Sequence, residues 1–288
     1  MSGQMWTTVF FAMLMACSGA AGLANTPVPA ASATPAPDPC GGEARLLATA
    51  NRPTIGYSAC AVKQDTAVFE LGYQNQVTGT ASDGSVQSQI PQNFLRLGIA
   101  QRFELDVIGP NYVRTRSYDA VAPSTVTNGV TDSGLGFKYE FVPAGRWTVG
   151  VDGLYTGPNG SSFLTAGNAS YTGNLDASYA LSPSTAVGTT IAVTSTGGYA
   201  NGVHGRYGVT EPSFVLSTQI PHLYQFYAEY VLVSKIGLAE GARAFTDFGV
   251  QKLLGETTEI DVEYGHAFTG VQRLKFDYVG AGIVLELR

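Results

Sequence analysis

The sequence has no long hydrophobic run and carries little charge. Its longest apolar stretch, Val9 to Ala16, is far shorter than the roughly 18 residues of a membrane-spanning helix, which excludes a helical membrane protein. Charged residues make up 13% of the 288 residues, about half the share found in ordinary soluble domains. The formal net charge of −6 argues against a nucleic-acid binder.

Residues that carry chemistry are also few. The chain has three cysteines and three histidines, and it contains no G-x-S-x-G, P-loop or Cys-x-x-Cys motif. In the topology predicted below, His222 falls on the opposite side from His204 and His266, which argues against a shared metal site. We therefore predict no enzymatic activity, no cofactor and no metal. The alternative is a lipid hydrolase in which His266 pairs with a serine.

What the sequence does contain begins with an export signal. The apolar stretch near the N-terminus is followed by small residues and by Gly22-Leu23-Ala24, an acceptable cleavage site, so residues 1–24 are predicted to be a signal peptide. Cys17 lies in a stretch that resembles a lipoprotein cleavage box. Lipidation of Cys17 and a bystander role for it are both open alternatives.

From residue 65 onwards, segments of alternating polarity recur, with turn residues between them. In one of them, Ile260, Val262 and Tyr264 alternate with acidic residues. Such alternation is typical of strands with one apolar and one polar face. Twelve strands are predicted, at 69–73, 95–99, 103–107, 135–141, 147–151, 171–179, 187–193, 214–216, 224–230, 248–250, 260–264 and 279–287.

The links between these strands alternate between short and long. A β-sandwich need not sort its loops by length, whereas outer-membrane barrels have tight periplasmic turns and longer external loops. We therefore predict an all-β fold, a 12-stranded antiparallel transmembrane β-barrel over 65–288, with both termini periplasmic. The links expected to be long loops are 74–91, 109–131, 156–168, 195–206, 234–242 and 266–273.

The polar faces of the predicted strands carry most of the charge, so we expect them to enclose the lumen. Two interpretations stay open: the side chains line a solute path that repels anions, or they form a charge and hydrogen-bond network that holds the barrel's shape. The predicted lumen residues are Glu70, Arg96, Glu104, Asp106, Lys138, Glu140, Asp152, Asp176, Glu229, Asp247, Glu259, Asp261 and Glu263.

Residues 25–64 separate the signal from the barrel. The stretch up to Pro39 is rich in Ala and Pro, which predicts an extended linker. In the oxidising periplasm, Cys40 and Cys60 are expected to form a disulfide that contributes about 3 kcal/mol. The tied segment could enter the lumen and narrow it, or it could be a periplasmic flap with no gating role. We favour the flap.

Three stretches carry a family resemblance: Asn51 to Gln76, Asn93 to Val107 ("NFLRLGIAQRFELDV") and Ser133 to Phe141 ("SGLGFKYEF"). In this order they resemble the outer-membrane transporters labelled as the meta-cleavage pathway of phenol degradation. The resemblance spans roughly Cys40 to the end of the chain. It implies passive passage of small organic, including aromatic, solutes across the bacterial outer membrane.

The expected partners are outer-membrane lipid, the barrel assembly machinery and small organic solutes. Two alternatives to a channel remain open. One is the lipid hydrolase with His266, and the other is a plugged barrel with a structural or surface-interaction role.

Overall fold

The computed structural model describes most of the chain that follows the predicted linker. The predicted signal peptide, Cys17 and the linker up to Pro39 lie outside the described residues. Those described are 40–41, 45–80, 82–141, 143–200, 203–220, 223–238, 240–270 and 275–288.

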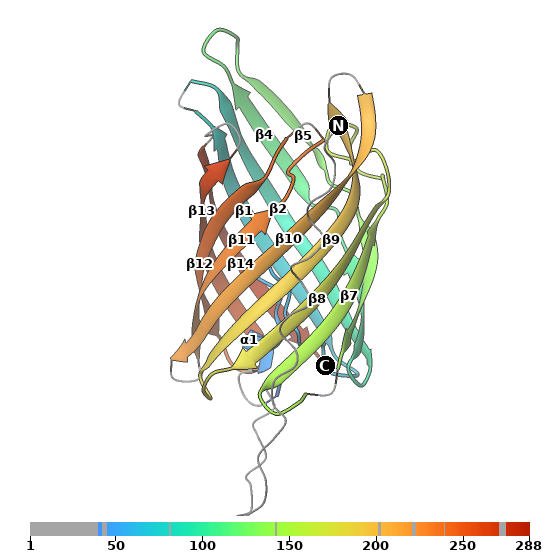
Figure 1. Cartoon of the computed structure of the whole chain (residues 1–288), viewed down its shortest axis with the longest axis vertical. Coiled ribbons are helices and arrows are strands. Elements are labelled where there is room, and N and C mark those ends of the chain that lie inside the picture. The colour runs from blue at the N-terminus through green and yellow to red at the C-terminus, as the bar shows by residue number, and fades with distance from the viewer. Residues whose placement is uncertain are drawn as a thin grey trace, which may run out of the picture. The chain divides into compact units, whose positions relative to one another are not determined.

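Twelve strands close into a ring in which every neighbouring pair is antiparallel (Figure 1). The ring closes where β1 pairs with β14, from Ala67 opposite Leu287 to Gly79 opposite Lys275. The predicted 12-stranded antiparallel barrel is therefore confirmed. Its strands are β1 (Ala67–Gly79), β2 (Gly84–Ala100), β3 (Phe103–Ile108), β6 (Gly134–Glu140), β7 (Trp147–Thr156), β8 (Ser170–Ala180), β9 (Thr185–Ala200), β10 (Val203–Ile220), β11 (Tyr224–Val233), β12 (Arg243–Leu253), β13 (Thr258–Gly270) and β14 (Lys275–Leu287).

Two further strands, β4 (Tyr112–Tyr118) and β5 (Thr125–Val130), form a hairpin that pairs with the first half of β2. The hairpin stands at one end of the barrel (Figure 1). The expected loops over 74–91, 109–131, 195–206 and 266–273 were therefore wrong in part, because strands β1, β2, β4, β5, β9, β10 and β13 run into them. For β1 and β2 the reason is that these extensions are polar on both faces, so they show no apolar alternation, yet their backbones stay paired.

The outward face of the barrel is apolar, as the alternation predicts. Leu135, Val193 and Phe214 are each more than half exposed. Rings pair near both ends of the β7–β8 pair: Trp147 with Tyr179 at 4.8 Å, and Tyr155 with Tyr171 at 5.5 Å. The two ring pairs are about 26 Å apart along the strand, at about 3.3 Å per residue. At a strand tilt of about 40°, this spacing is about 20 Å along the barrel axis, which is close to the height of about 25 Å of the apolar band between two aromatic girdles.

Residues 45–64 lie inside the barrel and not outside its end. This segment is called the plug. The expectation of a flap outside the lumen was therefore wrong. The plug starts with α1 (Arg45–Thr49), a helix too short to be stable alone. Its side chains Leu46 and Leu47 are buried with Val62 of the plug and with Val68 and Val284 of β1 and β14. Burial of this small core holds α1 at the end of the barrel opposite the β4–β5 hairpin (Figure 1).

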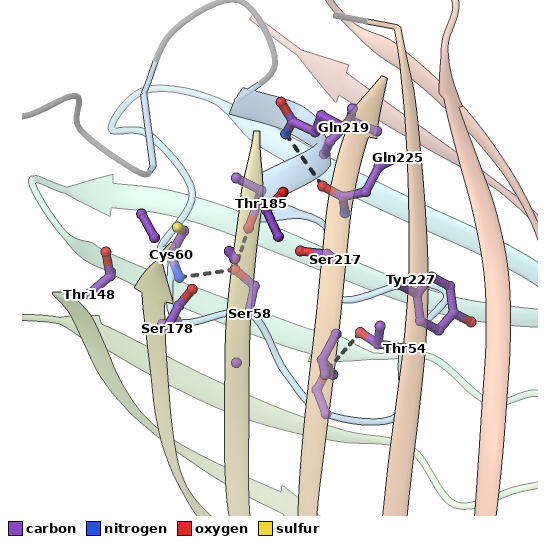
Figure 2. A pocket seen from close by; sticks show the side chains of 18 of the residues that line it. Thr54, Ser58, Cys60, Thr148, Ser178, Thr185, Ser217, Gln219, Gln225 and Tyr227 are labelled. Carbon is purple, nitrogen blue, oxygen red and sulfur yellow. Dashed lines mark hydrogen bonds between the residues drawn. The ribbon is translucent and has the colours of Figure 1, made fainter. Parts of the chain in front are cut away.

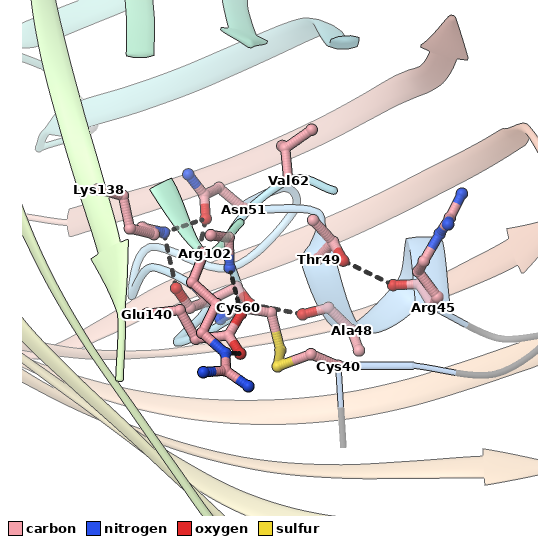
Figure 3. Close-up of a disulfide and its surroundings, with 12 residues drawn as sticks. Cys40, Arg45, Ala48, Thr49, Asn51, Cys60, Val62, Arg102, Lys138 and Glu140 are labelled. Atoms are coloured by element: carbon pink, nitrogen blue, oxygen red, sulfur yellow. Dashed lines mark hydrogen bonds and ion pairs between the residues drawn. A yellow bond between two sulfur atoms is a disulfide. The ribbon is translucent and has the colours of Figure 1, made fainter. Parts of the chain in front are cut away.

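The predicted disulfide between Cys40 and Cys60 is present, with a Cα–Cα distance of 5.5 Å (Figure 3). It ties the start of the described chain to the second half of the plug. Among the described residues, no helix is long and apolar enough to cross a membrane.

Candidate functional site

All thirteen predicted lumen residues are buried, and none is more than 7% exposed. Strand alternation explains their direction: on β13, Glu259, Asp261 and Glu263 point inward, while Ile260 and Val262 between them face outward. Burial of so many charged groups is costly unless they are paired or hydrogen-bonded. Most of the partners come from the plug.

Arg96 on β2 is the centre of the network. Its side chain has zero exposure, and it donates five hydrogen bonds, as many as a guanidinium has N–H groups. Two go to Glu104, at 2.9 and 3.2 Å, and one goes to Glu70 at 3.1 Å. The other two go to plug carbonyls, those of Thr49 and Cys60. Arg96 therefore binds two strands and both halves of the plug.

Four carboxylates that point into the lumen accept hydrogen bonds from the backbone of the plug. Carboxylates that accept backbone N–H bonds form charge-assisted hydrogen bonds, which are stronger than neutral ones. Six backbone N–H groups of the plug are held in this way. Glu70 accepts from Asn51 and Arg52 at 3.1 Å each, Glu229 accepts from Ile55 and Gly56 at 2.8 Å each, Glu140 accepts from Ala61 at 2.9 Å, and Glu104 accepts from Val62 at 2.5 Å.

Lys138 on β6 is held by the plug as well. Its ammonium donates to the Ser58 carbonyl at 2.7 Å. It also donates to the Asn51 side chain at 3.4 Å (Figure 3). It also lies 5.4 Å from the centre of the Tyr57 ring, within the range of a cation–π interaction. Burial raises the pKa of the Tyr57 phenol, and the carboxylate of Asp152 raises it further, so this phenol stays protonated.

Arg52 of the plug balances part of the acidic wall. It donates to Asp261 at 3.3 Å and to Gln92 at 2.8 Å, and it lies 3.8 Å from Glu263. Burial lowers the pKa of Arg52, but the Coulombic attraction of Asp261 and Glu263 outweighs this effect and leaves the pKa raised. The sequence analysis missed this role, because Arg52 lies before the first strand in a segment without periodicity.

The remaining predicted lumen acids bind mainly to the wall. Asp247 accepts hydrogen bonds from the hydroxyls of Tyr227 and Tyr278. Asp176 accepts from Thr190 at 2.7 Å. Glu259 makes no hydrogen bond to the plug among the described residues, although it is fully buried on β13. The acids of the lumen thus include a plug-binding group and a wall-binding group, whereas both carboxylate oxygens of Glu259 are buried without a hydrogen-bond partner among the described residues.

The plug leaves open space against the opposite wall, formed by β7 to β11. An inner cavity of about 600 Å³ reaches the short turn between β8 and β9. Thr54 and Ser58 of the plug line one side of it, and small side chains such as Ser178 and Ser217 line the other (Figure 2). Small residues on this wall leave the volume that the plug does not fill.

An outer cavity of about 490 Å³ lies toward the other end of the barrel, where the link between β11 and β12 contributes Lys235 and Ile236. Neither cavity is lined by any of the thirteen predicted lumen residues. This second wall could not be predicted from the sequence, because its inward positions carry Ser, Ala, Thr and Gly, which form no pattern of charge.

The two cavities meet at residues 55–57 of the plug, called the plug tip, where both are lined by Gly56, Tyr57 and Thr190. The Thr190 hydroxyl oxygen lies 3.1 Å from the Tyr57 carbonyl oxygen. A Cβ added at Gly56 would lie 2.2 Å from Ser213 Oγ and 3.0 Å from Glu229 Oε1. The plug tip is therefore in tight contact with β9, β10 and β11, and it separates the cavities.

Two of the three histidines lie in the described part of the chain, and neither faces a serine in the contacts observed. His266 pairs with Asp277 on β14, and His204 packs against Tyr199 with 4.8 Å between ring centres. His222 lies outside the described residues.

Comparison with solved structures shows the fold. The COG4313 outer membrane channel from Pseudomonas putida is similar over 82% of this chain and 100% of its own, with a TM-score of 0.62 and 12% identity. The NanC porin matches 75% of this chain and 100% of its own, with a TM-score of 0.50 and 13% identity. The translocator domain of the autotransporter NalP from Neisseria meningitidis matches 76% of this chain and 87% of its own, at a TM-score of 0.53 and 8% identity.

Comparison of the sequence with protein-family models and with curated proteins gives no match. The resemblance to the transporters of phenol degradation therefore stays a prediction.

Proposed function

We propose that the chain is a passive channel for small organic solutes in a bacterial outer membrane. The observation that carries this proposal is the pair of cavities on either side of the plug tip, with Gly56, Tyr57 and Thr190 between them. A sealed structural barrel needs no such volumes. A channel does, because solute must wait on one side of a constriction and leave on the other.

The proposed path follows the wall from β7 to β11. The plug is held mainly from the remaining strands, by Glu70, Arg96, Glu104 and Glu140, so the open side can widen while the plug stays attached. In this proposal most of the lumen acids act through the plug. Direct contact of the thirteen predicted lumen residues with solute stays a prediction.

Three further features support an outer-membrane location. The outward face is apolar between two aromatic pairs, the fold is shared with an outer membrane channel and a porin, and the chain begins with a predicted signal peptide over 1–24. Outer-membrane lipid and the barrel assembly machinery are the partners that such a location requires.

The test uses the mature protein in planar bilayers and in liposomes loaded with a panel of small aromatic and aliphatic solutes. Ser217→Trp places a large ring in the inner cavity, whereas Leu216→Trp, on the same strand, places it on the half-exposed outer face. We expect S217W to reduce flux and L216W to leave it unchanged. Folded protein that passes no ion and no solute would overturn the proposal.

The same preparation separates the alternatives. Lipid turnover that disappears in His266→Ala would favour the hydrolase. A correctly folded barrel with heat-modifiable gel mobility, no flux and no turnover would favour the plugged structural barrel.

A further inference from the structure

The outer cavity differs in character from the rest of the lumen. Its walls are largely apolar and include the aromatic rings of Tyr57, Tyr207, Phe245 and Phe276. Phe245 and Phe276 pack at 5.7 Å between ring centres, next to Ile55 of the plug tip. At about 490 Å³, the cavity falls within the usual range for a small-molecule site.

The charge of this cavity also differs from that of the rest of the lumen, which is mainly acidic. Two cations, Lys235 and Arg243, line it, together with one acid, Glu211. Neither cation has a carboxylate within ion-pair distance among the described residues. Glu240 acts on Arg243 electrostatically from farther away.

Both cations lie over aromatic rings instead. Lys235 Nζ is 5.4 Å from the centre of the Tyr207 ring, and the guanidinium carbon of Arg243 is 4.3 Å from that of Phe276. These contacts hold each charge beside the apolar wall without neutralising it. A ligand with a flat apolar body and one anionic end would place its ring on the aromatic wall. Its carboxylate would accept hydrogen bonds from Arg243 and Lys235.

We propose that the outer cavity is a binding site for small arylcarboxylates, which it captures before they pass the plug tip. The inference deepens the proposed channel function and rests on it for the direction of passage. Capture itself requires only the cavity. A neutral arene would gain the apolar contacts alone, and an arylammonium ion would be repelled by both cations.

The test is calorimetric titration of the full mature protein in detergent micelles with benzoate, benzyl alcohol and benzylamine. We expect benzoate to bind at least about tenfold more tightly than benzyl alcohol, because a hydrogen bond to a charged group contributes more than a neutral one. Benzylamine should bind more weakly than both. Equal binding of benzoate and benzylamine would overturn the inference.

Variants identify the groups responsible. Lys235→Gln and Arg243→Gln should each lower the affinity for benzoate and leave that for benzyl alcohol unchanged. Lys235 lies in a link between strands, so its variant keeps the test valid if a change on β12 disturbs folding. Arg206→Gln is the matched control, since Arg206 is exposed and hydrogen-bonded to backbone carbonyls outside the cavity. Unchanged benzoate affinity in K235Q and R243Q would overturn the inference.

The titration tests the binding site and the flux assay tests the channel, so one proposal can fail without the other. If benzoate binds in micelles but no solute crosses a bilayer, the channel function is wrong and the site stands. If neutral solutes cross but benzoate shows no preferential binding, the channel stands and the site is wrong.

Discussion

Arg96 and Glu104, eight residues apart on β2 and β3, form a doubly hydrogen-bonded ion pair in which both side chains have zero exposure. Two hairpin neighbours thus bury opposite charges in the interior of the barrel. The pair is satisfied only because the plug supplies the remaining partners: Glu104 accepts the Val62 N–H, and Arg96 donates to plug carbonyls. Docking of the plug and folding of the barrel are therefore coupled through this pair.

Loss of the Arg96 charge should loosen the plug and destabilise the barrel. Arg96→Met leaves Glu70 and Glu104 buried without their shared cation, which costs about 3–5 kcal/mol. We expect a lower free energy of unfolding in detergent and faster proteolysis within the plug.

Two variants test this explanation. R96M combined with Glu104→Gln should recover part of the lost free energy of unfolding, because the second substitution removes a buried charge that no longer has a partner. Arg116→Gln, at an exposed position of the β4–β5 hairpin, should change neither measurement. If R96M unfolds like the wild type, the buried pair does not stabilise the docked plug.

Removal of the disulfide should act on the plug more than on the barrel. The bridge closes a segment with a sequence separation of 20, and the double variant Cys40→Ser/Cys60→Ser should cost about 3 kcal/mol. All strand pairing remains, so heat-modifiable gel mobility should persist while the segment between the cysteines becomes sensitive to protease. Equal protease resistance with and without the bridge would contradict this prediction.

The strand alternation predicted much of the barrel but not the position of the plug, and particular residues show why. Glu259, Asp261 and Glu263 were placed on the inward face correctly, because the side-chain period of a strand is a local property. Arg52 and Gly56 could not be placed. Their positions depend on contacts with Asp261 and Glu229, about two hundred residues later in the chain, and no local pattern encodes such contacts.

The extended strands show a second limit. Around Gln74, Asn75 and Gln76 the sequence is polar on both faces, so it reads as a loop. The backbone nevertheless continues the β1–β2 ladder, in which Asn75 lies opposite Ser88. The Asn75 side-chain amide also donates to the Ser88 hydroxyl at 2.8 Å. Alternation of apolar and polar residues marks the part of a strand that faces lipid. Where a strand continues beyond the lipid, both of its faces can be polar, and the alternation no longer predicts it.

Loss of the Glu229 charge should raise channel activity. Glu229→Gln replaces one of the two oxygens that accept the Ile55 and Gly56 N–H groups with an amide donor, and the lost hydrogen bonding amounts to about 1–3 kcal/mol. We expect a higher open probability in single-channel recordings. Glu259→Gln makes the same chemical change without touching the plug, so its open probability should match the wild type. A similar rise in both variants would mean that lumen charge, and not plug contact, controls opening.

A methyl group at Gly56 should displace the plug tip. The added Cβ would lie 2.2 Å from Ser213 Oγ, and relief of such overpacking typically costs about 1–3 kcal/mol, a change of about 5- to 150-fold in the ratio of docked to displaced tip. Gly56→Ala should therefore raise conductance.

Ser213→Ala supplies the control, since it removes the clashing oxygen and leaves the strand intact. By itself S213A should conduct like the wild type, and G56A combined with S213A should return toward wild-type conductance. The rescue separates a steric cause from a general loss of stability, because a merely destabilised barrel would not recover on losing a second side chain. If the double variant conducts as much as G56A, the contact between the plug tip and β10 does not close the passage.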